Sequence, residues 1–201
     1  MAARIVVEDV RGIPMRVFAE RPRSLAQVAD IVRVRPERDF LACGVRRLTD
    51  HELLDDANRI AANLQARGLQ PGDRVAILSA NSIDWATAFW GTVFAGGVVA
   101  ALNGWWKAPE ILYALGHCTP RFLVADGPRF ERLASVASSD DLARLEGVFV
   151  IGAEYEGTEP FARLLGRTRA SAVSTSTGRI TSPGTLGWMS IEMSLSTAMS
   201  R

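Results

Sequence analysis

Four short apolar segments alternate with stretches of helical character, and this alternation limits the possible folds more than any other feature of the sequence. The segments are residues 74–78, 98–102, 121–125 and 148–151, and the first and third begin with an arginine before the apolar run. Continuous apolar runs of this length are typical of strands that are buried on both faces. The sequence therefore predicts an α/β fold, with a parallel or mostly parallel sheet and crossover helices between its strands.

The clearest helix signal begins at Thr49. Thr49 and Glu52 have the spacing of a capping box, in which each side chain accepts a hydrogen bond from a free backbone N–H group of the first turn. Gly68 supplies a left-handed stop after Arg67. Between these ends the apolar residues recur on one face of the predicted helix, and they are Leu53, Ala57, Ile60, Ala61 and Leu64.

Weaker signals indicate further elements. Ser24 can cap a helix that carries Leu25, Val28, Ile31 and Val32 and that Pro36 closes. Residues 40–48, interrupted at Gly44, predict a short β-hairpin. Three more helices are expected: after the polar residues 79–82, from Pro109, and over residues 130–136.

The longest stretch without a charged residue runs from Trp85 to Leu102. As one helix it would be about 27 Å long, close to the roughly 30 Å of a bilayer core. However, Gly96 and Gly97 interrupt it and a strand-like run follows. We therefore expect a buried helix followed by a strand, and no membrane span.

Charge and cysteine content narrow the possible functions. The formal net charge is +1, so no broad basic field would attract nucleic acid. Cys43 and Cys118 lie in no paired motif, which argues against a disulfide framework or a thiolate metal site. The first ten residues lack the apolar core of a secretory signal. These features predict a cytoplasmic protein that binds no nucleic acid.

Several motifs occur in order between residues 40 and 126. They are Leu-Thr-Asp-His-Glu-Leu at 48–53, Ala-Asn-Arg at 57–59, Leu64 to Gly68, Gln-Pro-Gly-Asp-Arg-Val-Ala-Ile-Leu at 70–78, Asn81-Ser82 with Trp85 and Phe89, Phe94 to Asn103, Pro109 to Leu115, and Arg121 to Asp126. In order and spacing they resemble the sequence blocks of the adenylate-forming (AMP-binding) family of acyl-CoA synthetases, luciferases and peptide-synthetase adenylation domains. Asp50 stands where that family usually has an aromatic residue. The resemblance implies that residues 1–167 are part of the large N-terminal domain of such an enzyme.

The resemblance also implies a reaction. Family members join a carboxylic acid to the α-phosphate of ATP, and a thiol such as coenzyme A then displaces AMP. A complete enzyme would thus use ATP, Mg²⁺ and coenzyme A, here with a fatty or other apolar acid. The family's phosphate loop, magnesium-binding glutamate and C-terminal lysine all lie downstream of the matched blocks. We therefore assign no catalytic, cofactor-binding or metal-binding residue, and we expect this chain to be inactive alone.

Residues 168–201 differ in character from the rest. They are rich in serine and threonine, and Glu192 is their one acidic residue after position 170, which is typical of a disordered tail. Residues 174–179 have the composition of a phosphate loop, but neither a preceding strand nor a following lysine supports that function. A frameshift near residue 168 would also explain the change, because residues 189–194 could read Asp-Val-Asp-Arg-Asp-Val in a neighbouring frame.

Two alternatives to a ligase fragment remain. One is a non-catalytic α/β module that binds a partner chain carrying the rest of the ligase, which would require an exposed apolar face. The other is an independent Rossmann-like domain, but the loops after Leu78 and Ala125 lack the G-x-G-x-x-G fingerprint. If further strands normally complete the sheet, its open edge predicts marginal stability.

The remaining polar candidates indicate ordinary surface positions. His51 fits an exposed first helical turn, and His117 fits a helix end, where its charge would suit the dipole. The pairs Asp55-Asp56 and Asp140-Asp141 are interpreted as solvated acids, and Lys107 as part of a surface turn. The tryptophans are expected to pack against the helices and the sheet.

Overall fold

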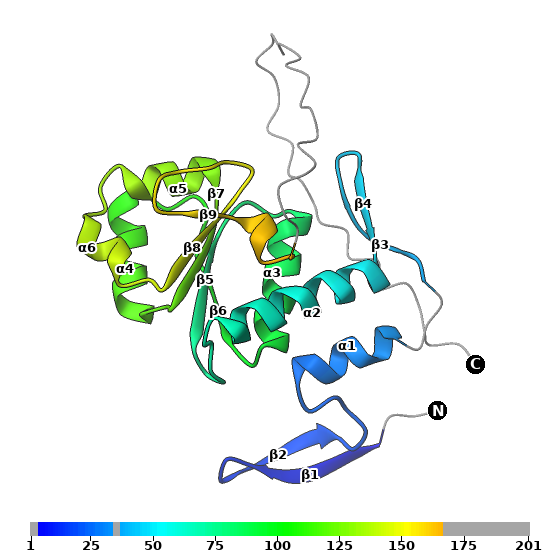
Figure 1. The fold of residues 1–201 in the computed structure, drawn as a ribbon. Coiled ribbons are helices and arrows are strands. Elements are labelled where there is room, and N and C mark those ends of the chain that lie inside the picture. Colours follow the sequence, from blue (N-terminus) through cyan, green and yellow to red (C-terminus); the bar gives the residue numbers. More distant parts are fainter. Residues whose placement is uncertain (1–3, 34–36, 167–201) are drawn as a thin grey trace, which may run out of the picture. The chain divides into compact units, whose positions relative to one another are not determined.

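A computed structural model describes residues 4–33 and 37–166 of the chain (Figure 1). Its contacts divide the chain into two compact units, Met1–Pro36 and Glu37–Arg201, which we describe separately. The expected tail, with the candidate phosphate loop and the frameshift site, lies outside the described residues. The domain boundary at residue 167 therefore stays a prediction.

The first unit contains a β-hairpin and a helix. The antiparallel strands β1 (Ile5–Val10) and β2 (Ile13–Phe18) pair directly, and helix α1 (Leu25–Arg33) follows as predicted. The sequence analysis assigned no strand here. The turn explains the pairing, because Arg11 and Gly12 both have positive φ angles, 55° and 82°, as a tight two-residue hairpin turn requires.

The second unit is built on a five-stranded parallel sheet, which confirms the predicted fold class. In spatial order its strands are β6 (Val98–Ala101), β5 (Arg74–Leu78), β7 (Phe122–Asp126), β8 (Gly147–Ile151) and β9 (Glu159–Pro160). A separate hairpin, β3 (Asp39–Cys43) with β4 (Arg46–Thr49), precedes the sheet in the chain and was also predicted.

Helices cover both faces of this sheet (Figure 1). One face carries α2 (Asp50–Ala66), α3 (Ile83–Phe94) and the 3₁₀ turn η1 (Phe161–Arg163). The other carries α4 (Ala108–Cys118), α5 (Gly127–Ala134) and α6 (Ser139–Ala143). The sequence analysis did not predict β9, η1 or α6, and it placed the end of α5 two residues too late.

Helix α2 begins as the capping box predicts. The Glu52 amide donates to Thr49 Oγ1 at 3.2 Å, and the Thr49 amide donates to Glu52 Oε2 at 2.9 Å. The helix stops before Gly68, which has a φ angle of 92°. The predicted apolar stripe is fully buried in the described structure.

Asp50, the departure from the family pattern, is the first residue of α2 and is only 1% exposed. Its Oδ1 atom accepts a hydrogen bond from the Arg38 amide at 3.3 Å, and its Oδ2 atom lies 3.8 Å from Arg38 Nε. A carboxylate with a nearby guanidinium thus occupies the place of an aromatic ring, and it ties the start of the second unit to α2.

The strands β5 and β7 form the centre of the core. Ala76, Ile77, Leu78, Leu123 and Ala125 have no exposed surface, as continuous apolar runs in a doubly covered sheet require. The uncharged stretch from Trp85 to Leu102 divides into α3, a turn at Gly96 and strand β6, as expected. Among the described residues, no helix has both the length and the hydropathy that a bilayer crossing demands.

Candidate functional site

The strand order has a topological switch point at the carboxyl ends of β5 and β7. After β5 the chain crosses to β6 on one side, and after β6 it returns to β7 on the other side. In open α/β sheets, ligands bind beyond the carboxyl ends of the strands at such a switch point. A ligand is therefore expected near the residues that follow Leu78 and Ala125.

Asp126, the last residue of β7, organises this edge. Its Oδ2 atom accepts hydrogen bonds from the Ala80 amide at 2.8 Å and from Ser79 Oγ at 3.3 Å. Its Oδ1 atom accepts from the Arg129 amide at 3.1 Å, and so caps α5. Asp126 thus links the two strand ends that define the switch point.

Two arginines of α5 bind the loop between β6 and α4. Arg129 Nη1 forms an ion pair with Asp126 Oδ2 at 2.7 Å, and its Nε donates to the Gly104 carbonyl at 3.0 Å. Arg132 Nη1 donates to the carbonyls of Gly104 at 3.1 Å and Trp106 at 2.9 Å. A Cβ atom at position 104 would lie 2.5 Å from Arg129 Nε, so a larger residue there would displace the Arg129 side chain.

Trp105 completes the cluster and corrects an expectation. Its side chain is 82% exposed instead of packing against the fold, and the Arg129 guanidinium lies 5.9 Å from the centre of its ring. We call Ser79, Asp126, Arg129, Arg132 and Trp105 the carboxyl-edge cluster. It carries two guanidiniums against one carboxylate, so it favours an anionic or aromatic ligand group over a cation.

The groups of the carboxyl-edge cluster that remain open suit ligand binding. Both oxygens of Asp126 already accept hydrogen bonds, and one of them also pairs with Arg129. A carboxylate held in this way stabilises the loop that it binds. The spare donors of the two guanidiniums and the exposed indole ring are the groups that a ligand could contact.

The structure does not bring the other candidate residues together. His117 stacks on Tyr113, with ring centres 5.9 Å apart, and Lys107 lies exposed at the start of α4. His51 is in the first turn of α2, but it is half-buried instead of exposed, and its Nε2 atom is buried.

Asp55 and Asp140 are exposed, as predicted, whereas Asp141 caps the short helix α6. Cys43 and Cys118 are free thiols, and burial raises the pKa of Cys118. Across the described residues, no three histidine, cysteine or acidic side chains gather as a metal site.

Sequence reasoning included Asp126 in a family motif but missed its role. A usable signal was present, because an aspartate at a strand end, followed by Gly127 and Pro128, is typical of a helix N-cap with proline in the first turn. The contact of Arg129 with Gly104 had no such signal, since it joins residues that are 25 positions apart.

Solved structures define the class of protein that this fold represents. Over 69% of its length the chain superposes on the anthranilate CoA ligase AuaEII, solved in complex with anthranoyl-AMP, with a TM-score of 0.63 and 28% identity. The match covers 27% of that structure. The described fold is therefore that of part of the N-terminal domain of the adenylate-forming ligases.

Sequence comparisons agree with this class. The chain is 38% identical over 80 residues to the long-chain-fatty-acid–CoA ligase of Bacillus subtilis (strain 168), covering 40% of this chain and 14% of the ligase. It is 32% identical over 134 residues to the medium/long-chain-fatty-acid–CoA ligase FadD6 of Mycobacterium tuberculosis, covering 65% and 22% respectively. The model of the AMP-binding enzyme family matches residues 28–172, and the chain belongs to that family.

Proposed function

We propose that this chain is the first part of an ATP-dependent acid–CoA ligase that acts on a fatty or other apolar carboxylic acid in the cytoplasm. The single observation that carries the proposal is the family match over residues 28–172, which includes the sheet and the carboxyl-edge cluster. The substrate class rests on the curated relatives, two of which are named for fatty acids.

We further propose that the chain alone does not form acyl-adenylates. Adenylation needs a loop whose backbone N–H groups and lysine hold the polyphosphate. The one lysine of the sequence is Lys107, and it precedes α4 without a glycine-rich loop around it. The described residues also do not fit a magnesium site. ATP, Mg²⁺ and coenzyme A would bind where further chain completes the domain.

Within such an enzyme the carboxyl-edge cluster would line the ligand crevice. Arg129 and Arg132 are held in place by backbone carbonyls and by Asp126. Guanidiniums fixed in this way can face an anionic substrate group with little loss of side-chain freedom. Their role is binding and orientation.

A chimera tests the proposed function. Residues 37–166 would replace the corresponding part of FadD6, and acid-dependent exchange of pyrophosphate into ATP would be measured. We expect the chimera to retain exchange, because this unit supplies a compatible sheet and crevice wall. A soluble, cooperatively folded chimera without exchange would contradict the proposal.

The second candidate is a module that binds a partner chain carrying the rest of the ligase. One observation favours it: β6 is an edge strand of the sheet, and its Val98 is 50% exposed. Co-expression with a tagged FadD6 segment that follows the matched region tests this function. Recovery of a stoichiometric complex supports the module, and recovery of the tagged segment alone contradicts it.

A further inference from the structure

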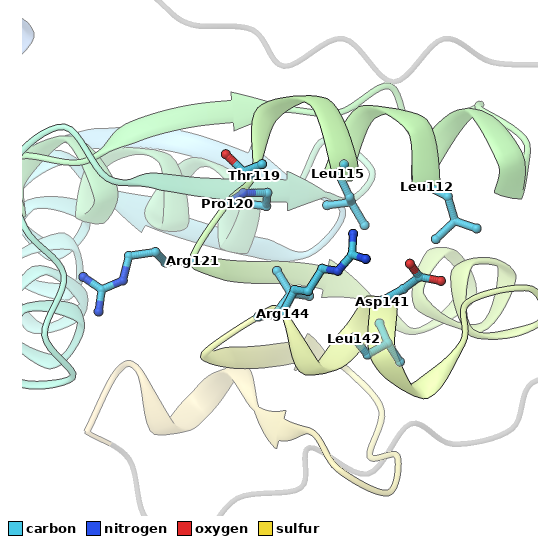
Figure 2. A pocket seen from close by; sticks show the side chains of 10 residues that line it. Leu112, Leu115, Thr119, Pro120, Arg121, Asp141, Leu142 and Arg144 are labelled. Carbon is cyan, nitrogen blue, oxygen red and sulfur yellow. The ribbon is translucent and has the colours of Figure 1, made fainter.

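A cavity of about 250 Å³ lies between α4 and α6, beside the amino end of β7 (Figure 2). Asp126 is at the opposite end of that strand, so the cavity is separate from the carboxyl-edge cluster. Its walls come from the second half of α4, the turn at Thr119 and Pro120, and the helix α6 with the residues that follow it.

The cavity has an apolar side. Leu112 and Leu115 reach it from α4, and Leu142 and Leu145 reach it from α6 and the turn after α6. All four are half-buried. A dry cavity of about 150 Å³ lined by such residues can hold benzene, so this one has room for a branched or aromatic side chain.

Two opposite charges lie on the polar side, Asp141 and Arg144 (Figure 2). Arg144 extends toward α4 (Figure 2). Within residues 4–33 and 37–166 its guanidinium donates no hydrogen bond, and its charge attracts the Asp141 carboxylate. Asp141 Oδ2 accepts two hydrogen bonds from Ser138, at 3.1 Å from the amide and 2.7 Å from Oγ. These bonds lower the pKa of Asp141, so the carboxylate is charged at neutral pH, and its Oδ1 atom remains available.

Arg121, the third charged residue of the lining, already binds other groups of the protein. Arg121 points away from the cavity (Figure 2) and binds Asp73, Glu146 and the Gly68 carbonyl. The charges open to a ligand are therefore one guanidinium and one carboxylate. A simple fatty-acid anion would be attracted by Arg144 but repelled by Asp141. An alkylammonium ion would be attracted by Asp141 but repelled by Arg144.

We propose that this cavity binds a small zwitterion with an apolar side chain, of the size of leucine or phenylalanine. The carboxylate of such an amino acid pairs with Arg144, its ammonium group pairs with Asp141 Oδ1, and its side chain lies among the four leucines. Each group of the ligand then has a complementary partner, and neither cavity charge remains unpaired.

Methyl NMR of the full chain with labelled leucines tests the proposal directly. L-Leucine is titrated, and 4-methylpentanoate and isopentylamine serve as analogues that lack the ammonium and the carboxylate. We expect saturable shifts at Leu112, Leu115, Leu142 and Leu145, and binding of each analogue weaker by at least about tenfold, because each loses a charged hydrogen bond. Absent shifts, or equal binding of all three compounds, would overturn the proposal.

Two pairs of variants separate the site from general effects. Arg144→Gln should weaken L-leucine binding at least about tenfold, whereas Arg47→Gln, at an exposed arginine of the β3–β4 hairpin, should not change it. A Cβ atom at Gly116 would meet nothing within 4 Å, so this position can be enlarged without a clash. Gly116→Leu should block the cavity and Gly116→Ala should leave binding intact. Equal binding by Gly116→Leu and Gly116→Ala would contradict the assigned location.

Discussion

Gly91 of α3 lies directly against Ile60 of α2. A Cβ atom at Gly91 would be 2.4 Å from Ile60 Cγ2 and 3.2 Å from the Ala57 carbonyl oxygen. Both distances are shorter than a normal contact, so the two helices can cross this closely only because position 91 has no side chain. This crossing brings α2 and α3 together over one face of the sheet.

Gly91→Ala should therefore destabilise the fold, although alanine is the better helix former. Overpacking of a tight core contact costs about 1–3 kcal/mol. The matched control is Gly116→Ala on α4, where the added methyl group meets nothing within 4 Å and should stabilise by about 0.5–1 kcal/mol. Urea unfolding of both variants measures the difference. If both substitutions stabilise the protein, the close crossing of α2 and α3 is wrong.

Asp126→Asn should also lower stability, by about 2–3 kcal/mol, because it removes the charge that pairs with Arg129 and holds the Ala80 amide. Asp126 and Arg129 have side chains only 15% and 14% exposed, so water compensates little. Asp140→Asn, at an exposed aspartate, is the control and should change stability by less than about 0.5 kcal/mol. Equal effects in denaturant melts would mean that Asp126 does not organise the carboxyl edge.

Thr49→Ala should lower the free energy of unfolding by about 1 kcal/mol, because it removes the N-cap of α2. Thr49 Oγ1 accepts from the Glu52 amide and also donates to Glu37 at 2.7 Å. Thr49→Ser keeps this hydroxyl and should retain most of the stability. Thermal unfolding followed by circular dichroism can rank the three proteins, and a serine variant as unstable as the alanine variant would speak against the cap.

The Arg121–Asp73 pair should make the stability of the fold depend on pH. Hydrogen bonding to Arg121 lowers the pKa of Asp73 below its ordinary value. Asp73 is therefore protonated more readily in the unfolded chain than in the folded protein. The stability that its charged form contributes is complete above the ordinary carboxyl pKa of about 4, and it is lost as the pH falls through the lower pKa of Asp73 in the folded protein.

Arg121→Met removes the cause of that shift. The stability gap between the wild type and this variant should be largest near pH 7 and should narrow as the pH falls toward 3. Chemical unfolding at pH 7, 5 and 3 measures the gap. A gap that widens in acid would show that Arg121 does not favour the charged form of Asp73.

Four strands of the central sheet were predictable because each carries a continuous apolar run, and α2 was predictable because its capping box is local. The first hairpin was missed because its strands mix charged with apolar residues and its turn depends on the unusual φ angle of Arg11. Strand β9 has only two residues, and its pairing with Phe149 and Val150 is a tertiary contact, so it leaves no sequence pattern.

The carboxyl-edge cluster was also predictable only in part, where its contacts are local in the sequence. Asp126 is recognisable as a helix cap from its own neighbours. Its bond to the Ala80 amide joins residues 46 positions apart, which only the crossover connection of the sheet brings together. Trp105 was expected to pack against the helices and the sheet, yet it lies exposed in a loop that two arginines hold, Arg129 over its ring and Arg132 at the neighbouring carbonyls.

The chain belongs to the AMP-binding enzyme family, and we propose that it does not form acyl-adenylates alone. The most direct test is acid-dependent exchange of labelled pyrophosphate into ATP by the purified 201-residue chain, assayed with octanoate and palmitate beside FadD6 as the active control. We expect exchange by FadD6 and only background exchange by this chain. Exchange by the chain that rises and saturates with either acid would contradict the account.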